Sequence, residues 1–266
     1  DSLDPVVPGL GPPPFSSARL LSVAPGLGKQ ANHRNIFLRM RRIALLLALA
    51  APAAAETHRP PMMPAGDHGQ WAAIGRVNVT GYNRRSACTG TLIAPDRVLT
   101  AAHCVFRGNA PARAADIRFA AGWFRGEAVA LGRVDSVRIP ESWTPDARPD
   151  AATVASDIAI LTLTAPITAI PPLPLSDGTG GEMRIIGYRW DRPHALTDHA
   201  PCFGTVRFAP ALGLSCRVAF GTSGEPVLTR ENGDWAVMGV TSARSDDITL
   251  AAPVTRAGST RPAQTD

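Results

Sequence analysis

The chain has 266 residues, of which 45% are apolar, and its formal net charge is +5. A chain of this size and composition holds one large core or two small ones, which excludes a disordered or fibrous protein. Aromatic residues are scarce at 6%, whereas 24 glycines and 25 prolines favour short strands joined by turns over long helices. The expected fold class is therefore all-β.

The positive charge is unevenly distributed along the chain. Residues 1–55 contain six basic and two acidic residues, whereas the remaining residues contain 21 basic and 20 acidic ones. Binding to nucleic acid needs basic side chains gathered on one face. The nearly neutral body of the chain therefore argues against a nucleic-acid partner.

Residues 40–55 have the layout of a secretory signal peptide. Two arginines are followed by the apolar stretch Ile43–Ala51 and by three alanines before Glu56. The apolar run of about 13 residues is shorter than the ~20 that cross a bilayer. A buried helix or a membrane span is the alternative. We expect a secreted or periplasmic protein, with no stable membrane insertion after the signal is removed.

Residues 1–39 precede this signal, begin without methionine and are rich in proline and glycine. We interpret them as a disordered extension, or as upstream sequence translated in error, with Met40 as the true start. Residues 56–70 are then expected to form an N-terminal arm of the mature chain.

Four cysteines lie in the mature part, and none forms a C-x-x-C metal-binding pair. In an oxidising compartment they are expected to form two disulfides. Three pairings are possible. The local one joins Cys88 to Cys104 and Cys202 to Cys216, and each bond closes a loop of about 15 residues, worth roughly 3 kcal/mol in the chain-entropy model. No metal or cofactor is expected, because histidine and cysteine show no ligand spacing.

From Trp71 onward, short apolar runs alternate with turn residues. The candidate strands in chain order are AIGRVNV, TGTLIA, RVLTA, IRFAAG, AVALGRV and IAILTL, followed by MRIIGY, GTVRF, PVLT, WAVMGVT and TLAAPV. Residues 71–165 and 179–254 are predicted to form two antiparallel β-barrels, since closure removes exposed strand edges. Four prolines in residues 166–178 predict an extended connector, and residues 255–266 a polar tail.

The stretch CTGTLIAPDRVLTAAHCV, Cys88–Val105, places His103 at the end of a strand beside a cysteine. An imidazole fixed in this way suits general-base catalysis, which requires hydrogen-bonding distances of about 2.6 to 3.2 Å. The other histidines are interpreted as packed or surface residues: His33, His58, His68, His194 and His199.

Two further polar residues have contexts that suit catalysis. Asp157 precedes the apolar run Ile158–Leu161, so its carboxylate enters a buried strand and needs a partner, which His103 would supply. In AFGTSGEPV, glycines flank Ser223 and allow the N–H groups of Gly221 and Ser223 to converge on an oxyanion. Taken alone, Asp157 could only cap a strand and Ser223 could be a turn serine.

These stretches resemble the three motifs of the trypsin-like (chymotrypsin-fold) serine proteases. LTAAHC resembles the histidine motif, SDIAIL the aspartate motif and GTSGEP the G-D-S-G-G-P serine motif, in the family's order within residues 71–253. The resemblance implies two six-stranded antiparallel β-barrels with the active site between them. It also implies a triad of His103, Asp157 and Ser223, which would hydrolyse protein or peptide substrates through an acyl-enzyme. A monomer is expected.

The serine motif departs from the family's pattern at two positions. Thr222 stands where trypsin-like zymogens have an aspartate, and the I-V-G-G start that provides its partner is also missing. This resembles the bacterial, glutamyl-endopeptidase-like branch and implies an oxyanion hole that forms without a buried N-terminus. Glu225 replaces the second glycine, and we expect its carboxylate either to point to solvent or to depress activity by repelling the oxyanion.

The resemblance also indicates a substrate-binding pocket. It places Arg217 near the pocket floor and GVTSAR along the wall, which makes candidates of Thr241, Ser242, Ala243 and Arg244. An arginine at the floor would favour an acidic side chain before the scissile bond, unless Arg217 is a surface residue. Asp246 and Asp247 would instead suit a basic side chain, so the specificity stays open.

Two other functions remain as alternatives. A catalytically impaired protease homologue acting as a binding module is motivated by Thr222 and Glu225. An exported β-sandwich adhesion protein would leave the order of His103, Asp157 and Ser223 to chance, and would place their side chains far apart.

Overall fold

The computed structural model describes residues 60–79, 88–145, 148, 150–178, 181–202, 205–208, 210–216, 218, 221–245 and 248–256. The predicted extension, the predicted signal peptide and most of the predicted tail lie outside these residues. Three residues considered for substrate specificity also lie outside them: Arg217, Asp246 and Asp247.

Strands dominate the described residues. They are β1 (Ile74–Val79), β2 (Cys88–Ala94), β3 (Arg97–Thr100), β4 (Phe106–Arg107), β5 (Ala110–Pro111), β6 (Ile117–Ala121), β7 (Ala130–Arg138), β8 (Ala159–Leu163), β9 (Met183–Arg189), β10 (Arg192–Asp198), β11 (Thr205–Phe208), β12 (Ala211–Leu214), β13 (Pro226–Glu231), β14 (Asp234–Ser245) and β15 (Ile248–Pro253). The helical segments are short: η1 (Ala65–Asp67), η2 (Gly69–Trp71), η3 (Ala102–Val105), η4 (Ala114–Asp116) and α2 (Ala151–Ser156). The fold is mostly β, as predicted.

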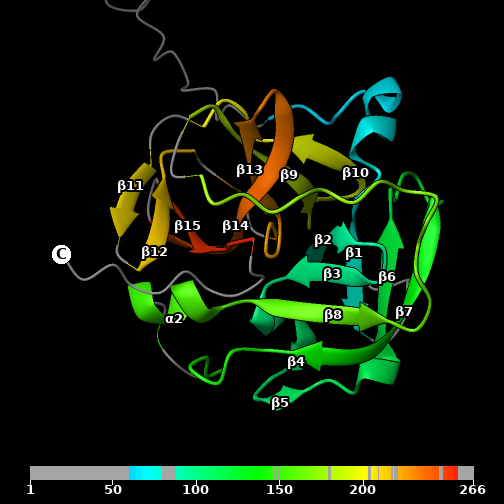
Figure 1. The fold of residues 1–266 in the computed structure, drawn as a ribbon, viewed down its shortest axis with the longest axis horizontal. Helices are drawn as coiled ribbons and strands as arrows, with labels where there is room; N and C mark the ends of the chain where they lie inside the picture. Colours follow the sequence, from blue (N-terminus) through cyan, green and yellow to red (C-terminus); the bar gives the residue numbers. More distant parts are fainter. Residues whose placement is uncertain are drawn as a thin grey trace, which may run out of the picture. The chain divides into compact units, whose positions relative to one another are not determined.

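Six of the strands close into an antiparallel barrel in the order β1-β2-β3-β8-β7-β6, which Figure 1 shows in cyan and green. Its interior is filled by fully buried apolar side chains, among them Leu92, Val98, Phe119 and Leu161. Burial alternates along β7 and β8, as expected of strands with one face on the core, whereas successive residues of β2 and β3 are buried. The first predicted barrel therefore has its expected six strands.

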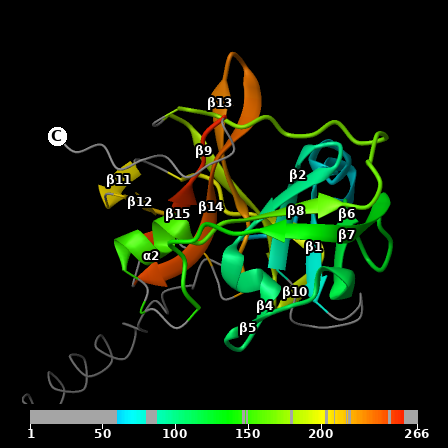
Figure 2. The same cartoon turned by 60° about the horizontal axis from the view of Figure 1, so that its bottom comes forward.

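Strands β4 and β5 pair with each other, and the other strands form a seven-stranded sheet in the order β10-β9-β13-β14-β15-β12-β11 (Figures 1 and 2). The two edge strands do not pair with each other among the described residues, so this part differs from the six-stranded barrel expected for the second half. Strands β10 and β12 were not predicted. Strand β10 contains Pro193, and β12 has only four residues, so neither has a strong strand signal in the sequence.

The proline-rich connector runs between the barrel and the sheet and bonds to both. The Leu173 N–H donates to Leu92 O of β2 at 2.9 Å, and the Ser176 N–H donates to Val237 O of β14 at 2.8 Å. Apolar side chains from the barrel, such as Ile74 and Leu99, share one buried cluster with the side chain of Leu228 in the sheet. The two halves of the mature chain are therefore packed into a single core.

Two disulfides are present, Cys88–Cys104 and Cys202–Cys216, which is the local pairing. The first ties the start of β2 to η3, the segment that carries His103. This short helix also follows closely on β3. His103 is therefore held by β3 on one side in the chain and by the disulfide of Cys104 on the other.

Candidate active site

His103 and Asp157 form a double hydrogen-bonded contact. His103 lies on η3, and Asp157 is the C-cap of α2, with its N–H bonded to Val154 O at 3.1 Å. His103 Nδ1 lies 2.7 Å from Asp157 Oδ2, and the His103 backbone N–H donates to Oδ1 at 2.9 Å. An ionised carboxylate only accepts hydrogen bonds, so the Nδ1 atom carries the proton and the Nε2 atom can act as a base.

Asp157 is 3% exposed and accepts a third hydrogen bond, from Ser242 Oγ to Oδ2 at 2.5 Å. Burial by itself would raise the pKa of Asp157. The hydrogen bond and the charge of the His103 side chain, together with the bond from Ser242, outweigh burial and hold this pKa below its usual value. Ser242 was expected only as a pocket residue, and its spacing in the sequence gave no sign that it reaches Asp157.

Ser223 lies on the loop Gly221–Glu225, which leads into β13. Gly221 has φ +85°, and a Cβ atom there would lie 2.6 Å from the backbone nitrogen of Trp190. Gly224 has φ +79°, and a Cβ atom there would lie 2.2 Å from Thr89 O. Both glycines of the serine motif are therefore needed for a left-handed backbone and for close approach to neighbouring main chain.

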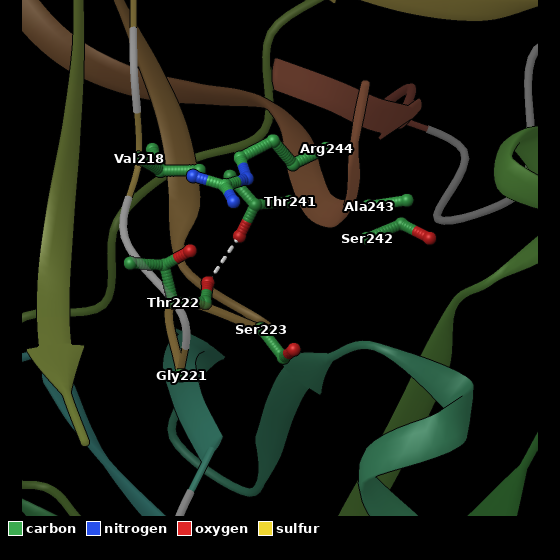
Figure 3. A pocket seen from close by; sticks show the side chains of 8 residues that line it. All are labelled: Val218, Gly221, Thr222, Ser223, Thr241, Ser242, Ala243 and Arg244. Carbon is green, nitrogen blue, oxygen red and sulfur yellow. Dashed lines mark hydrogen bonds between the residues drawn. The ribbon is translucent and has the colours of Figure 1, made fainter. Parts of the chain in front are cut away.

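Hydrogen bonds hold this loop to both halves of the molecule. The Thr89 N–H of β2 donates to Ser223 O at 2.9 Å, and the Gly224 N–H donates to Thr241 O of β14 at 2.9 Å. The Thr241 hydroxyl donates to Thr222 O at 2.5 Å, the bond drawn as a dashed line in Figure 3. The loop that carries Ser223 is thus fixed to the barrel on one side and to the sheet on the other.

Within the described part of the chain, the N–H groups of Gly221 and Ser223 donate no hydrogen bond to a protein acceptor. Both residues line a cavity of about 270 Å³, shown in Figure 3. Two unbonded backbone donors beside a serine hydroxyl are what an oxyanion site requires.

A second cavity, of about 210 Å³, is lined by His103 and Asp157 and by apolar side chains that include Trp143 and Val154. It shares Ser242 and Ala243 with the cavity beside Ser223. The structure thus joins His103 to Asp157 directly and places Ser223 on an adjoining cavity. Among the described residues, the Ser223 hydroxyl makes no hydrogen bond to His103, whose Nε2 atom lies 3.8 Å from Cys104 Sγ.

Of the five candidate pocket residues, Arg217 lies outside the described residues, and the other four line the cavity beside Ser223: Thr241, Ser242, Ala243 and Arg244. In Figure 3 the Arg244 side chain extends toward Val218, another lining residue. Arg244 is the charged side chain among the lining residues that the structure describes, so the cavity has a basic wall.

Glu225 does not point to solvent, so the first of the two alternatives predicted for it was wrong. The residue is 0% exposed, and its side chain lies against Gly187 of β9. Burial raises the pKa of the Glu225 carboxyl well above its usual range, with a smaller opposite effect from the charge of Arg189.

Cys88, Cys104 and His103 bring two sulfur atoms and an imidazole within 4.8 Å of one another. Both cysteines belong to one disulfide, so they offer no thiolate for a metal ion.

Comparison with known proteins identifies the family. Residues 88–240, more than half of the chain, match the family described as Trypsin-like peptidase domain. The chain belongs to the trypsin-like peptidase family. A trypsin-like peptidase of this kind is a serine endopeptidase, and its substrates are proteins or peptides. The alternative of a β-sandwich adhesion protein is therefore wrong.

Solved structures of two bacterial or microbial proteases have a similar fold. A thermostable serine protease, AL20, from an extremophilic microorganism matches with a TM-score of 0.56 and 18% identity, over 70% of this chain and 92% of its own. The protease Anisep from Arthrobacter nicotinovorans matches with a TM-score of 0.55 and 16% identity, over 68% of this chain and 90% of its own. No curated protein matches the chain. At these identities the two structures support the chymotrypsin-like fold of this trypsin-like peptidase.

No helix in the described residues is long and apolar enough to cross a membrane.

Proposed function

We propose that this trypsin-like peptidase cleaves peptide bonds with a triad of His103, Asp157 and Ser223. The observation that carries the proposal is the double contact between Asp157 and His103, which fixes the imidazole with Nδ1 protonated and Nε2 available. A buried carboxylate held in this way serves to orient a catalytic base and to stabilise its protonated form.

In the proposed mechanism, Ser223 Oγ attacks the carbonyl carbon of the substrate while His103 Nε2 accepts the hydroxyl proton. The carbonyl oxygen becomes an oxyanion, which binds to the N–H groups of Gly221 and Ser223. His103 then gives the proton to the leaving amine, and an acyl-enzyme forms. Water repeats the attack with His103 as base, releases the acid and restores Ser223.

The missing hydrogen bond between Ser223 and His103 is compatible with this mechanism. Catalytic hydrogen bonds in proteins without substrate are often long and tighten only when a substrate binds. The two side chains line adjoining cavities that share Ser242 and Ala243, so a peptide bond could contact both at once.

We infer that the site forms without a buried N-terminus, as in the bacterial branch that the serine motif resembles. Thr222 has no charge to pair with a new N-terminus, and the Thr241 hydroxyl bonds to its carbonyl instead. Extending the mature N-terminus by a few residues is expected to leave turnover unchanged. A large loss of turnover would contradict this inference.

The basic wall supports a preference for an acidic side chain before the scissile bond. Arg244 lines the cavity beside Ser223 together with Thr241, Ser242 and Ala243, which carry no charge. A guanidinium group binds a carboxylate through charge-assisted hydrogen bonds, so we propose that these four residues bind the substrate side chain.

We also propose that the enzyme is exported, either to the periplasm or out of the cell. The disulfides Cys88–Cys104 and Cys202–Cys216 support an oxidising compartment, and the sequence of residues 40–55 supports a cleaved signal. Mass spectrometry of the protein purified from its native compartment should find a mature N-terminus at Glu56.

A fluorophosphonate probe, which reacts with activated serines, tests the triad. The folded chain should be labelled, and both Ser223→Ala and His103→Ala should abolish the label. No labelling of the folded wild-type protein would favour the alternative, an impaired homologue that acts as a binding module.

A further inference from the structure

Glu225, two residues after Ser223, has a side chain that is completely enclosed. The residue as a whole and its side chain are both 0% exposed to solvent. The side chain passes over Gly187 of β9 so closely that a Cβ atom there would lie 2.2 Å from Glu225 Cγ. The absence of a side chain at position 187 therefore makes the space that Glu225 occupies.

The carboxyl group of Glu225 faces a histidine in this space. Glu225 Oε2 lies 3.6 Å from His199 Nε2, and both side chains are 0% exposed. His199 follows β10, and its backbone N–H donates to Ile185 O of β9 at 2.9 Å, which fixes the position of the residue. At 3.6 Å the two groups are farther apart than a hydrogen bond but within the range of an ion pair, so a change in the protonation of either group changes the interaction between them.

Several charged groups lie near the pair. Asp198, which precedes His199 at the end of β10, pairs with Arg184 of β9 at 3.1 Å. Arg189 of β9 is the other charged group that acts on Glu225, and Asp191 holds its guanidinium through two bonds of 2.9 Å. Strand β14 faces Glu225 with Thr241, and β2, which packs against β9 and β13, has no ionisable side chain. Burial raises the pKa of the Glu225 carboxyl in this space, and the charge of Arg189 opposes that effect.

The main chain of Glu225 connects this pair to the loop with Ser223. Its N–H is shared between Thr222 O at 3.2 Å and Thr241 Oγ1 at 3.0 Å, and its carbonyl accepts the Thr241 N–H at 2.9 Å. Any displacement of Glu225 therefore moves Thr222 and, with it, the N–H groups proposed to bind the oxyanion.

We propose that Glu225 and His199 form a buried pair that positions the loop Gly221–Glu225, and that a change in the protonation of either group makes the order of this loop depend on pH. Glu225 and His199 are positioning residues in this proposal, since neither touches the substrate. The effect on Ser223 rests on the proposed protease function, whereas the buried pair itself does not.

Two variants of Glu225 distinguish the effect of the shape of its side chain from the effect of its ionisable proton. Glu225→Gln keeps the size and shape of the side chain, but it cannot gain or lose a proton. Glu225→Ala removes the whole contact. The control is Glu231→Gln, which removes a carboxylate from the far end of β13, the strand that follows Glu225, where it pairs with Arg256. The readout is the rate of fluorophosphonate labelling from pH 5 to 9.

Glu225→Ala should slow labelling by about 100-fold at the pH where the wild type reacts fastest, the size expected when reacting groups are displaced by about 1 Å. Glu225→Gln should slow it by about tenfold and should remove one ionisation from the pH profile of the wild type, leaving that of the catalytic histidine. Glu231→Gln should match the wild type. The proposal is overturned if Glu225→Gln keeps the wild-type pH profile or if Glu225→Ala labels at the wild-type rate.

The space above Gly187 provides a second test that does not require Glu225→Ala to fold well. Gly187→Ala introduces a methyl group where Glu225 Cγ lies, so it should slow labelling as strongly as Glu225→Ala. The double variant Gly187→Ala with Glu225→Ala should be no slower than Glu225→Ala alone, because the clash is gone. Additive losses in the double variant would contradict the placement of Glu225 over Gly187.

The buried pair can also be tested if the protein turns out to have no protease activity. If the wild type is never labelled, the pH dependence of unfolding still tests the pair. The unfolding free energy of the wild type should then fall relative to that of Glu225→Gln as the pH rises above about 4.3, the ordinary pKa of glutamate. Equal pH dependence of the two proteins would overturn the buried pair.

Discussion

Two carboxyl groups beside the candidate active site are both buried and both face a histidine, yet their surroundings differ. Asp157 accepts bonds from His103 Nδ1, from the His103 backbone and from the Ser242 hydroxyl. Glu225 lies 3.6 Å from His199, and neither of its oxygens has a hydrogen bond within the described residues.

This difference shows that burial does not by itself decide the charge of a carboxyl group. The pKa of Asp157 is lowered despite burial, because three donors favour the ionised form. The pKa of Glu225 is raised, because burial acts there with little compensation. The Asp157 carboxyl therefore holds a negative charge, and the Glu225 carboxyl holds a proton.

Replacing each carboxyl by its amide should separate the two regions most strongly. Asp157→Asn should lower kcat/KM by about 10⁴-fold at neutral pH, because an amide cannot hold the imidazole with Nδ1 protonated or stabilise the imidazolium. Glu225→Gln should cost only about tenfold, since no negative charge is required there. Steady-state kinetics on one peptide substrate measures both. Equal losses would contradict the contrast between the two carboxyl groups.

A methyl group at Gly224 tests how tightly the serine loop is held against the barrel. Gly224→Ala should destabilise the protein by at least about 2 kcal/mol and lower activity, because the residue has a positive φ and faces Thr89 O. Gly233→Ala is the matched control, since Gly233 has φ +92° and nothing within 4 Å of the added atom. Chemical denaturation measures both. If the two variants lose equal stability, the contact with Thr89 is unimportant.

The basic wall of the cavity can be reversed. Arg244→Glu should change the ratio of kcat/KM for substrates with glutamate and lysine before the scissile bond by about 10- to 150-fold, which corresponds to a charged hydrogen bond of about 1.5 to 3 kcal/mol. Arg230→Glu, on β13 and outside the cavity lining, should leave the ratio unchanged. An unchanged ratio in Arg244→Glu would assign the specificity to other residues.

The smallest expected effect is an opposite pH dependence of stability in the two regions. The contribution of Asp157 is present above its ordinary pKa of about 3.9 and is lost as the pH falls through the lowered folded value. The contribution of Glu225 is present below about 4.3 and is lost as the pH rises through the raised folded value. Unfolding curves of Asp157→Asn and Glu225→Gln against the wild type, from pH 3 to 9, should diverge in opposite directions. The same sign for both variants would contradict the assigned charges.

The sequence by itself determined the family, the mostly β fold and the identity of the candidate residues. Short apolar runs bounded by glycine, proline and other turn residues mark most strands, because a buried strand is brief and ends at a turn. The motifs around His103, Asp157 and Ser223 were recognisable because each combines a reactive side chain with glycine, cysteine or a buried strand in a fixed order. Strands β10 and β12 lacked this pattern and were missed.

Only the tertiary structure decided which groups meet. Ser242 reaches Asp157 across 85 positions of sequence, and Glu225 meets His199 in a space left by Gly187. Neither contact has a sequence signal, because both depend on how β14 and β9 pack after the chain has folded. The charge of a buried carboxyl group follows from the donors around it, and those donors are brought together by packing rather than by sequence order.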